Sequence, residues 1–298
     1  MSQKCVITGG AGFIGSHLAE LLINKNFEVE IIDNLSTGRK ENIQHLKNKV
    51  RLHELDLSDN TSDLSEIVKN ADYIFHLASL ADIVPSIKFP EIYFKANVQS
   101  TLNLLKACNT KKLKKFVYAA SSSCYGIAKQ IPTTETAQIS PEYPYALTKY
   151  IGEELLMHWA KVYKINAIST RFFNVFGTRS RTSGTYGAVF GVFLAQKLAA
   201  EPLTIVGDGN QTRDFIHVAD VAHANVMVAE SDVVGVFNVG SGVEYSVNQI
   251  AMLTKNPYGT TTIPSREGEA RRSLSDNTKL KDIGWQPRIG LEAWIAKQ

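Results

Sequence analysis

The first fifteen residues constrain the fold of this chain more than any other stretch. Lys4–Thr8 has the length and apolar character of a buried strand, and a helical pattern from about Ser16 to Asn24 follows a glycine-rich turn. The turn has the spacing Gly-x-x-Gly-x-x-Gly, at Gly9, Gly12 and Gly15. These glycines would permit a tight turn, let a pyrophosphate approach the backbone and let the helix pack on the strand. Strand, turn and helix in one unit predict a dinucleotide site, with the phosphates at the helix N-terminus.

An acidic residue at the end of the second strand selects the dinucleotide. The strand pattern Glu28–Ile32 ends at Asp33. A carboxylate at this spacing from the glycines binds a ribose 2′-hydroxyl, and its charge repels the 2′-phosphate of NADP. The sequence therefore predicts NAD as the cofactor.

Strands and helices alternate after this unit. Further strand patterns occur at 50–55, 73–78, 116–120 and 167–172, which predicts a parallel sheet with right-handed crossovers. We expect an α/β fold, namely a doubly wound parallel sheet of the Rossmann type with a smaller α/β C-terminal substrate lobe. The chain of 298 residues is long enough for both parts. The expected domains are 1–173 with 213–240 for NAD, and 174–212 with 241–298 for the substrate.

A polar segment follows the strand pattern at 116–120. Ser121, Ser122 and Ser123 come at the carboxyl edge of the sheet, where open α/β sheets bind their ligands. Tyr145 and Lys149 lie four residues apart at the start of a helical pattern, so both side chains emerge on one face. A hydroxyl, a phenol and an ammonium in one cleft suit proton transfer to or from an alcohol. A Tyr-x-x-x-Lys pair alone is a weak signal, and the dinucleotide site is what favours a redox function for it.

Composition and charge argue against several other classes of protein. The net charge of +3 is too small to indicate nucleic acid or a membrane surface as a partner, and no Cys/His cluster has the spacing of a metal site. The three cysteines are odd in number and scattered, which favours a reducing compartment. Met1 leads straight into the first strand, and no segment is long and apolar enough to cross a membrane. We expect a cytoplasmic enzyme.

Seven motifs occur in order along nearly the whole chain. They are Thr8–Gly15, Asp33–Ser36, His76–Ala78, Ser121–Ser123, Tyr145-x-x-x-Lys149, Arg171–Asn174 and Arg213–Phe215. The set resembles the extended short-chain dehydrogenase/reductase family, specifically its nucleotide-sugar 4-epimerases of the UDP-galactose and UDP-N-acetylglucosamine type. That resemblance implies an NAD-dependent isomerase.

The resemblance also implies a reaction and three catalytic residues. Tyr145 would take the proton of the sugar C4 hydroxyl, while NAD accepts the C4 hydride and returns it to the opposite face of a 4-keto sugar. Lys149 would hold the nicotinamide ribose, and Ser121 would bind the reacting hydroxyl. A free Tyr has a pKa near 10, so service as a base near pH 7 needs its anion favoured by ~4 kcal/mol. An ammonium and the positive nicotinamide at close range can together provide this.

By the same resemblance, a larger set of residues would bind NAD. Those after the third strand would contact the adenine, and those after the fourth would face the rest of the cofactor. The set is Gly9, Gly12, Phe13, Ile14, Gly15, Asp33, Asn34, Leu35, Ser36, Thr37, Gly38, Asp56, Leu57, Leu77, Ala78, Ser79, Ala81, Asn97, Tyr145, Lys149 and Phe173.

For the nucleotide sugar, the resemblance assigns residues by the part they would contact. Arg213 and Arg266 would clamp the diphosphate, which Arg can bind bidentately. Glu269 would accept the ribose hydroxyls, although the family usually has Asp at this position. The other members of the set are Ala188, Val189, Thr204 and Val206 for the uracil, Asn174 for the pyrophosphate or sugar, and Ser121, Ser122, Ser123, Tyr145 and Ser273 for the sugar.

Two positions separate neighbouring activities. Related dehydratases and decarboxylases have a segment that looks like Thr-Asp-Glu or Thr-Ser-Glu where this chain has Ser121–Ser123, so an acid for elimination is missing here. Ser273 is small where relatives have either Tyr or a small residue beside the sugar C2 substituent, which leaves room for an N-acetyl group. We therefore expect 4-epimerisation of UDP-Glc/UDP-Gal and of UDP-GlcNAc/UDP-GalNAc.

Several alternatives stay open at this point. One is a UDP-glucuronate 4-epimerase, although these enzymes usually have Thr where Asn174 stands. Another is a dehydratase or decarboxylase of the same fold, and outside enzymes the alternative is an NAD-binding regulator. Helices near Leu102 and Leu155 suggest a homodimer. Four arginines either contact phosphate or lie on ordinary surface: Arg179, Arg181, Arg271 and Arg272.

Overall fold

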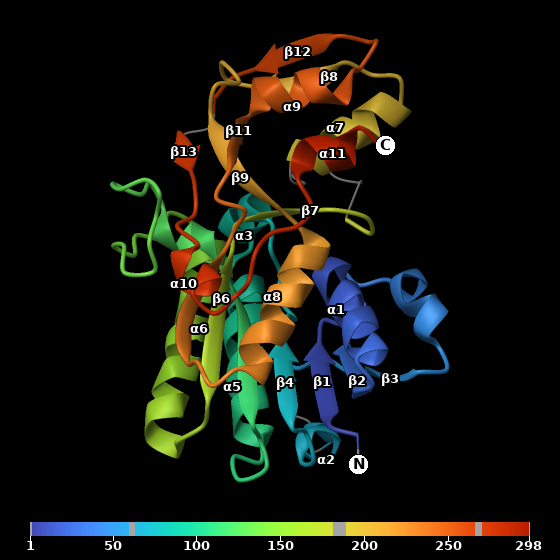
Figure 1. Ribbon diagram of the computed structural model, residues 1–298, viewed down its shortest axis with the longest axis vertical. Coiled ribbons are helices and arrows are strands. Elements are labelled where there is room, and N and C mark those ends of the chain that lie inside the picture. Colours follow the sequence, from blue (N-terminus) through green and yellow to red (C-terminus); the bar gives the residue numbers. More distant parts are fainter. Residues whose placement is uncertain (1, 60–62, 181–188, 266–269, 298) are drawn as a thin grey trace. The chain divides into compact units, whose positions relative to one another are not determined.

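A seven-stranded sheet with the strand order β10-β6-β5-β4-β1-β2-β3 organises the first part of the structure (Figure 1). The pairs β1–β2, β2–β3, β1–β4 and β4–β5 are parallel. Strand β1 is the switch point, because β2 and β3 lie on one side of it and β4, β5 and β6 on the other. This order confirms the predicted doubly wound α/β fold. The strands are β1 (Lys4–Thr8), β2 (Glu28–Asp33), β3 (Val50–Glu54), β4 (Tyr73–His76), β5 (Lys115–Ser121), β6 (Ala167–Phe172) and β10 (Gly235–Val239).

Helices cover this sheet and enclose its core. One core cluster joins Val6, Ile74 and Phe116 of three neighbouring strands to Leu104 and Leu156 of two helices. The α-helices are α1 (Phe13–Asn24), α2 (Asp63–Val68), α3 (Ile83–Lys88), α4 (Pro90–Phe94), α5 (Ser100–Ala107), α6 (Pro144–Tyr163) and α8 (Val218–Glu230). Two other helical segments are the 3-10 helix η1 (Lys40–Leu46) and the π-helix η2 (Lys95–Gln99).

The second part of the structure contains two small sheets. Strand β9 (Thr212–His217) lies between β11 (Glu244–Ser246) and β13 (Arg272–Ser273), and β7 (Asn174–Phe176) also pairs with it. Its apolar core includes Phe176, Phe193, Phe215 and Leu291. The other elements are β8 (Leu203–Val206), which pairs with β12 (Thr260–Ile263), η3 (Ser122–Tyr125), α7 (Val189–Leu198), α9 (Val247–Thr254), α10 (Thr278–Lys281) and α11 (Leu291–Ile295).

The computed structural model describes residues 2–59, 63–180, 189–265 and 270–297. The chain divides into two compact units, the first made of Met1–Ser121, Tyr143–Arg171 and Ala222–Phe237, and the second of Ser122–Glu142, Phe172–Val221 and Asn238–Gln298. Residues 122–142 follow a strand of the first unit but belong to the second, because Thr133 donates its N–H to Leu274 O and accepts at its own carbonyl from Asp276 N–H. Within the described residues, no helix has the length and apolarity needed to span a membrane.

Candidate active site

The glycine-rich turn lies between β1 and α1 in the first unit. Gly9 has φ +69°, and a Cβ on it would lie 2.7 Å from the backbone nitrogen of Ala78. A Cβ on Gly15 would overlap the carbonyl oxygen of Gly9, so the helix start packs directly on the turn. Gly12 precedes the first residue of α1, and no side-chain hydrogen bond caps this helix end. The turn therefore exposes backbone N–H groups in the way that a pyrophosphate requires, and the residues fit a dinucleotide.

Asp33 ends β2, and its side chain ties the second strand to this turn. Its Oδ2 accepts the N–H of Ala11 at 2.9 Å, and its Oδ1 accepts the N–H of Leu35 at 2.8 Å. Burial raises the pKa of this carboxyl, while the two backbone hydrogen bonds act in the opposite direction. Gly38 packs on the carboxylate, since a Cβ there would lie 2.7 Å from Oδ1. Each carboxylate oxygen keeps a further lone pair that could accept a ribose hydroxyl.

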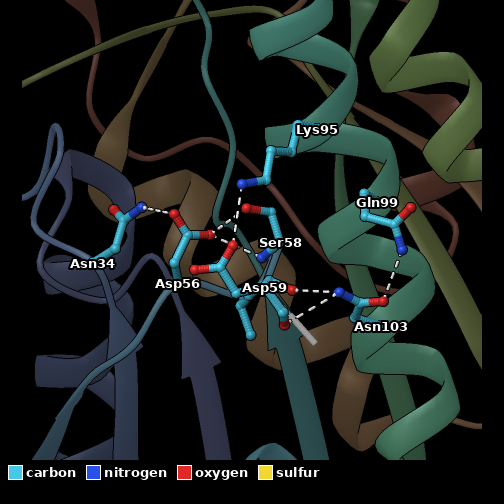
Figure 2. Close-up of polar contacts among 8 residues, drawn as sticks. Asn34, Asp56, Ser58, Asp59, Lys95, Gln99 and Asn103 are labelled. Atoms are coloured by element: carbon cyan, nitrogen blue, oxygen red, sulfur yellow. Dashed lines mark hydrogen bonds and ion pairs between the residues drawn. The ribbon is translucent and has the colours of Figure 1, made fainter. Parts of the chain in front are cut away.

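A polar rim follows β3, where the sequence predicts adenine contacts (Figure 2). Asn34 donates to Asp56 Oδ2 at 3.0 Å, and Ser58 donates its N–H and its hydroxyl to Asp56 Oδ1 at 2.8 and 2.6 Å. Burial alone would raise the pKa of Asp56, but these bonds and the charge of Lys95 lower it overall. Leu57 is buried beside this rim. Ser36 completes the rim with two hydrogen bonds to Asn34, whereas Thr37 is exposed.

Residues beyond β4 are held by a buried chain of hydrogen bonds through His76. Thr8 Oγ1 lies 2.7 Å from His76 Nδ1, and His76 Nε2 lies 2.9 Å from Thr101 Oγ1. The Thr101 hydroxyl donates to Asn97 O, so His76 must donate from Nε2 and accept at Nδ1. Thr8 Oγ1 in turn accepts the N–H of Ala78 at 3.2 Å. Burial lowers the pKa of His76 to about 3, so the ring is neutral and structural at physiological pH.

Asn97 joins the residues after β4 to helix α6. Its amide nitrogen donates to Leu80 O at 3.1 Å and to Thr148 Oγ1 at 3.0 Å, and its Oδ1 accepts the N–H of Leu80 at 2.8 Å. Asn97 is 1% exposed and sits in the π-helix η2, a widened turn of the kind often found at functional sites. The sequence predicts that Asn97 contacts the cofactor. In the structure its side chain is bonded to Leu80, within the segment that also includes the predicted cofactor residues Leu77, Ala78, Ser79 and Ala81.

Tyr145 and Lys149 lie in the first turns of α6, which begins at Pro144. Lys149 is only 3% exposed, and its Nζ lies 4.4 Å from the centre of the Tyr118 ring. Burial lowers the pKa of Lys149 to about 7, and the negative charge of Glu153 acts in the opposite direction. Tyr145 is half-buried, and Ser121 is the half-buried last residue of β5. The first unit thus contains the glycine turn, Ser121, Tyr145 and Lys149 together.

Three of the predicted substrate residues meet on β9 in the second unit. Arg213 and Ser273 are register partners on neighbouring strands. Asn174 of β7 pairs with Phe215 of the same strand and donates to Asp214 O at 3.2 Å. Because partners in a sheet lie about 5 Å apart, an arginine, an amide and a small side chain are grouped at this strand.

Asp214 organises this group, and sequence reasoning assigned it no function. Asp214 is fully buried. Its Oδ1 accepts the N–H and the hydroxyl of Ser241 at 2.7 Å each. Its Oδ2 accepts the N–H of Gly242 at 3.0 Å and the N–H of Ser275 at 3.1 Å. These bonds attach the segment after β13, and hence Ser273, to β9. A carboxylate directly before the apolar pair Phe215 and Ile216 of a predicted strand was the available signal.

The remaining predicted residues have mixed surroundings. Thr204 and Val206 share one face of β8, opposite the buried Leu203 and Ile205, and Thr204 is bonded to Gln196 of α7. The exposed Arg271 forms an ion pair with Asp208, and the exposed Arg272 forms one with Glu244, which favours the surface interpretation over a phosphate contact for both arginines.

The other predicted residues are placed as follows. Four of them belong to the second unit, namely Ser122, Ser123, Phe173 and Val189. Arg181, Ala188, Arg266 and Glu269 lie outside the described residues, and Phe13, Ile14 and Arg179 lie within them.

Residues 5–240 match the model of the NAD dependent epimerase/dehydratase family. The chain belongs to this family. Membership confirms the resemblance to extended short-chain dehydrogenases/reductases and the prediction of NAD as the cofactor, and the protein is therefore an enzyme of this family.

Individual relatives are similar to this chain over nearly its whole length. A putative UDP-glucose 4-epimerase of Methanocaldococcus jannaschii is 36% identical over 98% of this chain and 96% of its own. A UDP-N-acetylglucosamine 4-epimerase from Methanobrevibacter ruminantium, solved with UDP-N-acetylmuramic acid, superposes with a TM-score of 0.93 at 34% identity and covers 100% of this chain and 99% of its own. A UDP-glucuronic acid 4-epimerase from Bacillus cereus, solved with UDP-glucuronic acid and NAD, superposes with a TM-score of 0.91 at 30% identity, over 99% of this chain and 97% of its own.

Proposed function

We propose that this enzyme inverts C4 of a UDP-hexose, acting on UDP-Glc/UDP-Gal and on UDP-GlcNAc/UDP-GalNAc. The observation that carries the proposal is the double contact of Asn97. Its side chain bonds the backbone of Leu80, two residues after the Ala78 that packs on Gly9. It also bonds Thr148, which lies between Tyr145 and Lys149. A redox cofactor site and a phenol–ammonium pair are therefore built against each other in one unit.

Each catalytic residue has a task at a particular atom. Tyr145 removes the proton of the C4 hydroxyl and later returns one to the C4 oxygen, and Ser121 orients that oxygen. NAD, when bound, supplies the hydride acceptor for C4. Lys149 favours the tyrosinate through its positive charge, and it binds the ribose of the nicotinamide. Water does not screen the charge of the buried Lys149, but the same burial lowers its pKa to about 7, so the effect requires the side chain to stay protonated.

The second unit would hold the nucleotide sugar. Arg213 on β9 supports diphosphate binding, with Asn174 and Ser273 on the adjacent strands. Ser273 supports acceptance of an N-acetyl group because its side chain is small. The proposed domain functions follow: NAD in the first unit and the UDP-sugar in the second, with Ala188, Val189, Thr204, Val206, Arg266 and Glu269 completing the nucleotide site.

Replacing the base tests the mechanism. Tyr145→Phe should abolish turnover, because the variant has no proton acceptor at C4 O, while circular dichroism shows an unchanged fold. Near-normal epimerisation by Tyr145→Phe would contradict the mechanism. Tyr163→Phe, at an exposed position at the end of the same helix, is the matched control and should keep full activity.

A substrate panel tests the activity itself. The full chain is incubated separately with UDP-Glc, UDP-GlcNAc and UDP-GlcA, and the products are resolved by chromatography and mass. Inversion of the first two without a change of mass is the expected result. Turnover of UDP-GlcA alone would favour the uronate 4-epimerase, a loss of water or CO₂ would favour a dehydratase or decarboxylase, and NAD binding without turnover would favour a regulator.

Exposed apolar side chains on α3, α4 and α6 support the homodimer. Ile87, Phe89, Ile92 and Phe94 are each at least half exposed, and Leu147 is 46% exposed. Leu155 instead packs against the core of its own unit, so it is not part of this exposed set. The exposed set is the face that a second copy would cover. Cys5, Cys108 and Cys124, all within the described residues, form no disulfide, which fits the proposed cytoplasmic location.

A further inference from the structure

One side chain, Tyr118 of β5, contacts both ends of Lys149. The ammonium of Lys149 lies over the face of the Tyr118 ring, 4.4 Å from its centre. The Tyr118 hydroxyl donates to the backbone carbonyl of the same lysine at 3.1 Å. Tyr118 is fully buried, so its ring has no freedom to leave this position without disturbing the core.

Gly152 on α6 makes this arrangement possible. A Cβ on Gly152 would overlap the Tyr118 hydroxyl oxygen and would lie 2.8 Å from Cζ of the ring. The same Cβ would come within 3.3 Å of Thr101 Oγ1. The helix therefore carries a glycine where the phenol passes against it, one turn after Lys149, and any larger residue would displace the ring.

Other charged or titratable groups around Lys149 are occupied elsewhere or neutral. On α6, Glu153 has both carboxylate oxygens bonded to Arg171 of β6, and Oε2 also accepts from Ser169. On β4, His76 is neutral and packs against Tyr118 with a centroid separation of 5.6 Å. Tyr145, on α6, is the proposed base. The negative charge of Glu153 also favours the ammonium. The Tyr118 ring adds a direct contact that favours the charged form without neutralising it.

We propose that Tyr118, seated against Gly152, is a positioning residue that holds Lys149 in place and keeps it protonated. Its effect on catalysis rests on the proposed function, whereas its effect on the ionisation of Lys149 does not. A desolvated contact between an ammonium and an aromatic ring favours the protonated form by about tenfold or more, which raises the pKa of the ammonium by about one unit or more. Removal of the ring should therefore lower the pKa of Lys149.

The first experiment measures that ionisation without any turnover. Lysine labelled with ¹³C at Cε is introduced into the full chain, the Lys149 signal is assigned by its loss in Lys149→Arg, and its shift is followed against pH. Tyr118→Leu should lower the titration midpoint by about one unit. Tyr118→Phe keeps the ring and should leave the midpoint unchanged. An unchanged midpoint in Tyr118→Leu, or an equal drop in both variants, would overturn the proposal.

The glycine provides a second variant if Tyr118→Leu does not fold. Gly152→Ala leaves the tyrosine in the chain but displaces its ring, so the Lys149 midpoint should fall. Adding Tyr118→Phe to Gly152→Ala removes the overlapping hydroxyl and should restore part of the shift. If the titration midpoint of Lys149 in Gly152→Ala equalled that of the parent, the proposed packing of Tyr118 against Gly152 would be contradicted.

The pH profile of epimerisation separates positioning from general structural damage. The apparent pKa values belong to the Tyr145–Lys149 pair, and loss of the ring lowers the alkaline one. Tyr118→Leu should therefore move the alkaline limb of kcat to lower pH, with little change of KM. A uniform drop of kcat at every pH would indicate a merely structural role. If the parent has no epimerase activity, the proposed function fails, and the titration still decides the role of Tyr118.

Discussion

The ion pair of Glu153 and Arg171 fastens α6, and with it Tyr145 and Lys149, to strand β6. Glu153 is 1% exposed and Arg171 is 4% exposed. Glu153 Oε2 accepts from Arg171 Nε at 3.0 Å and from Ser169 Oγ at 2.6 Å, and Oε1 accepts from Arg171 Nη2. Glu153→Ala removes the carboxylate that is paired with this buried guanidinium, and breaking a buried pair in this way costs about 3–5 kcal/mol. That is about a third of the free energy of unfolding of a typical domain, ~5–15 kcal/mol.

Urea unfolding followed by circular dichroism measures this loss. With a slope of about 3 kcal/mol/M, the midpoint should fall by about 1 M or more. Joint replacement by Glu153→Leu and Arg171→Met removes both charges and should be much less damaging than Glu153→Ala. Glu66→Ala breaks an exposed pair with Lys69 and should cost less than ~0.5 kcal/mol. A Glu153→Ala midpoint close to that of the parent would refute the reasoning, as would a double variant as unstable as the single one.

Three further predictions concern the cofactor turn, the substrate and pH. Gly15→Ala should abolish NAD binding in calorimetry, because its Cβ would overlap Gly9 O, whereas Gly290→Ala meets no atom within 4 Å and should bind normally. Ser273→Tyr should lower the ratio of activity on UDP-GlcNAc to activity on UDP-Glc, and an unchanged ratio would contradict the assignment of Ser273 to the sugar C2 substituent. Burial disfavours ionised Glu30, but hydrogen bonds from Lys4 and His53 outweigh it and lower the pKa of its carboxyl. Its contribution is thus fully present above the unfolded pKa of about 4.3 and is lost as pH falls through the lower folded pKa. Glu30→Gln should therefore destabilise at pH 7, and its difference from the parent should shrink as pH falls below about 4.

Much of the cofactor site follows from local sequence patterns. The strand Lys4–Thr8, the glycine spacing and the position of Asp33 are all within one βαβ unit, and the structure has these elements where the patterns predict them. The shared helix face of Tyr145 and Lys149 follows from helical periodicity alone. Such features depend on neighbours in the chain, and local propensity is enough to predict them.

The contacts that make these residues work are decided by the tertiary structure. Asn97 bonds Thr148 across 51 positions of sequence, and Asp214 bonds Ser275 across 61. Residues 122–142 join the second unit through bonds to 274–276, which no local pattern predicts. The environment of Lys149 likewise depends on Tyr118, 31 positions earlier, and on the absence of a side chain at Gly152. The sequence by itself determined which chemical groups are present and which face of a strand or helix they occupy. Only the folded chain decided which of them meet, because burial and charge act between atoms that are close in space, whatever their separation along the chain.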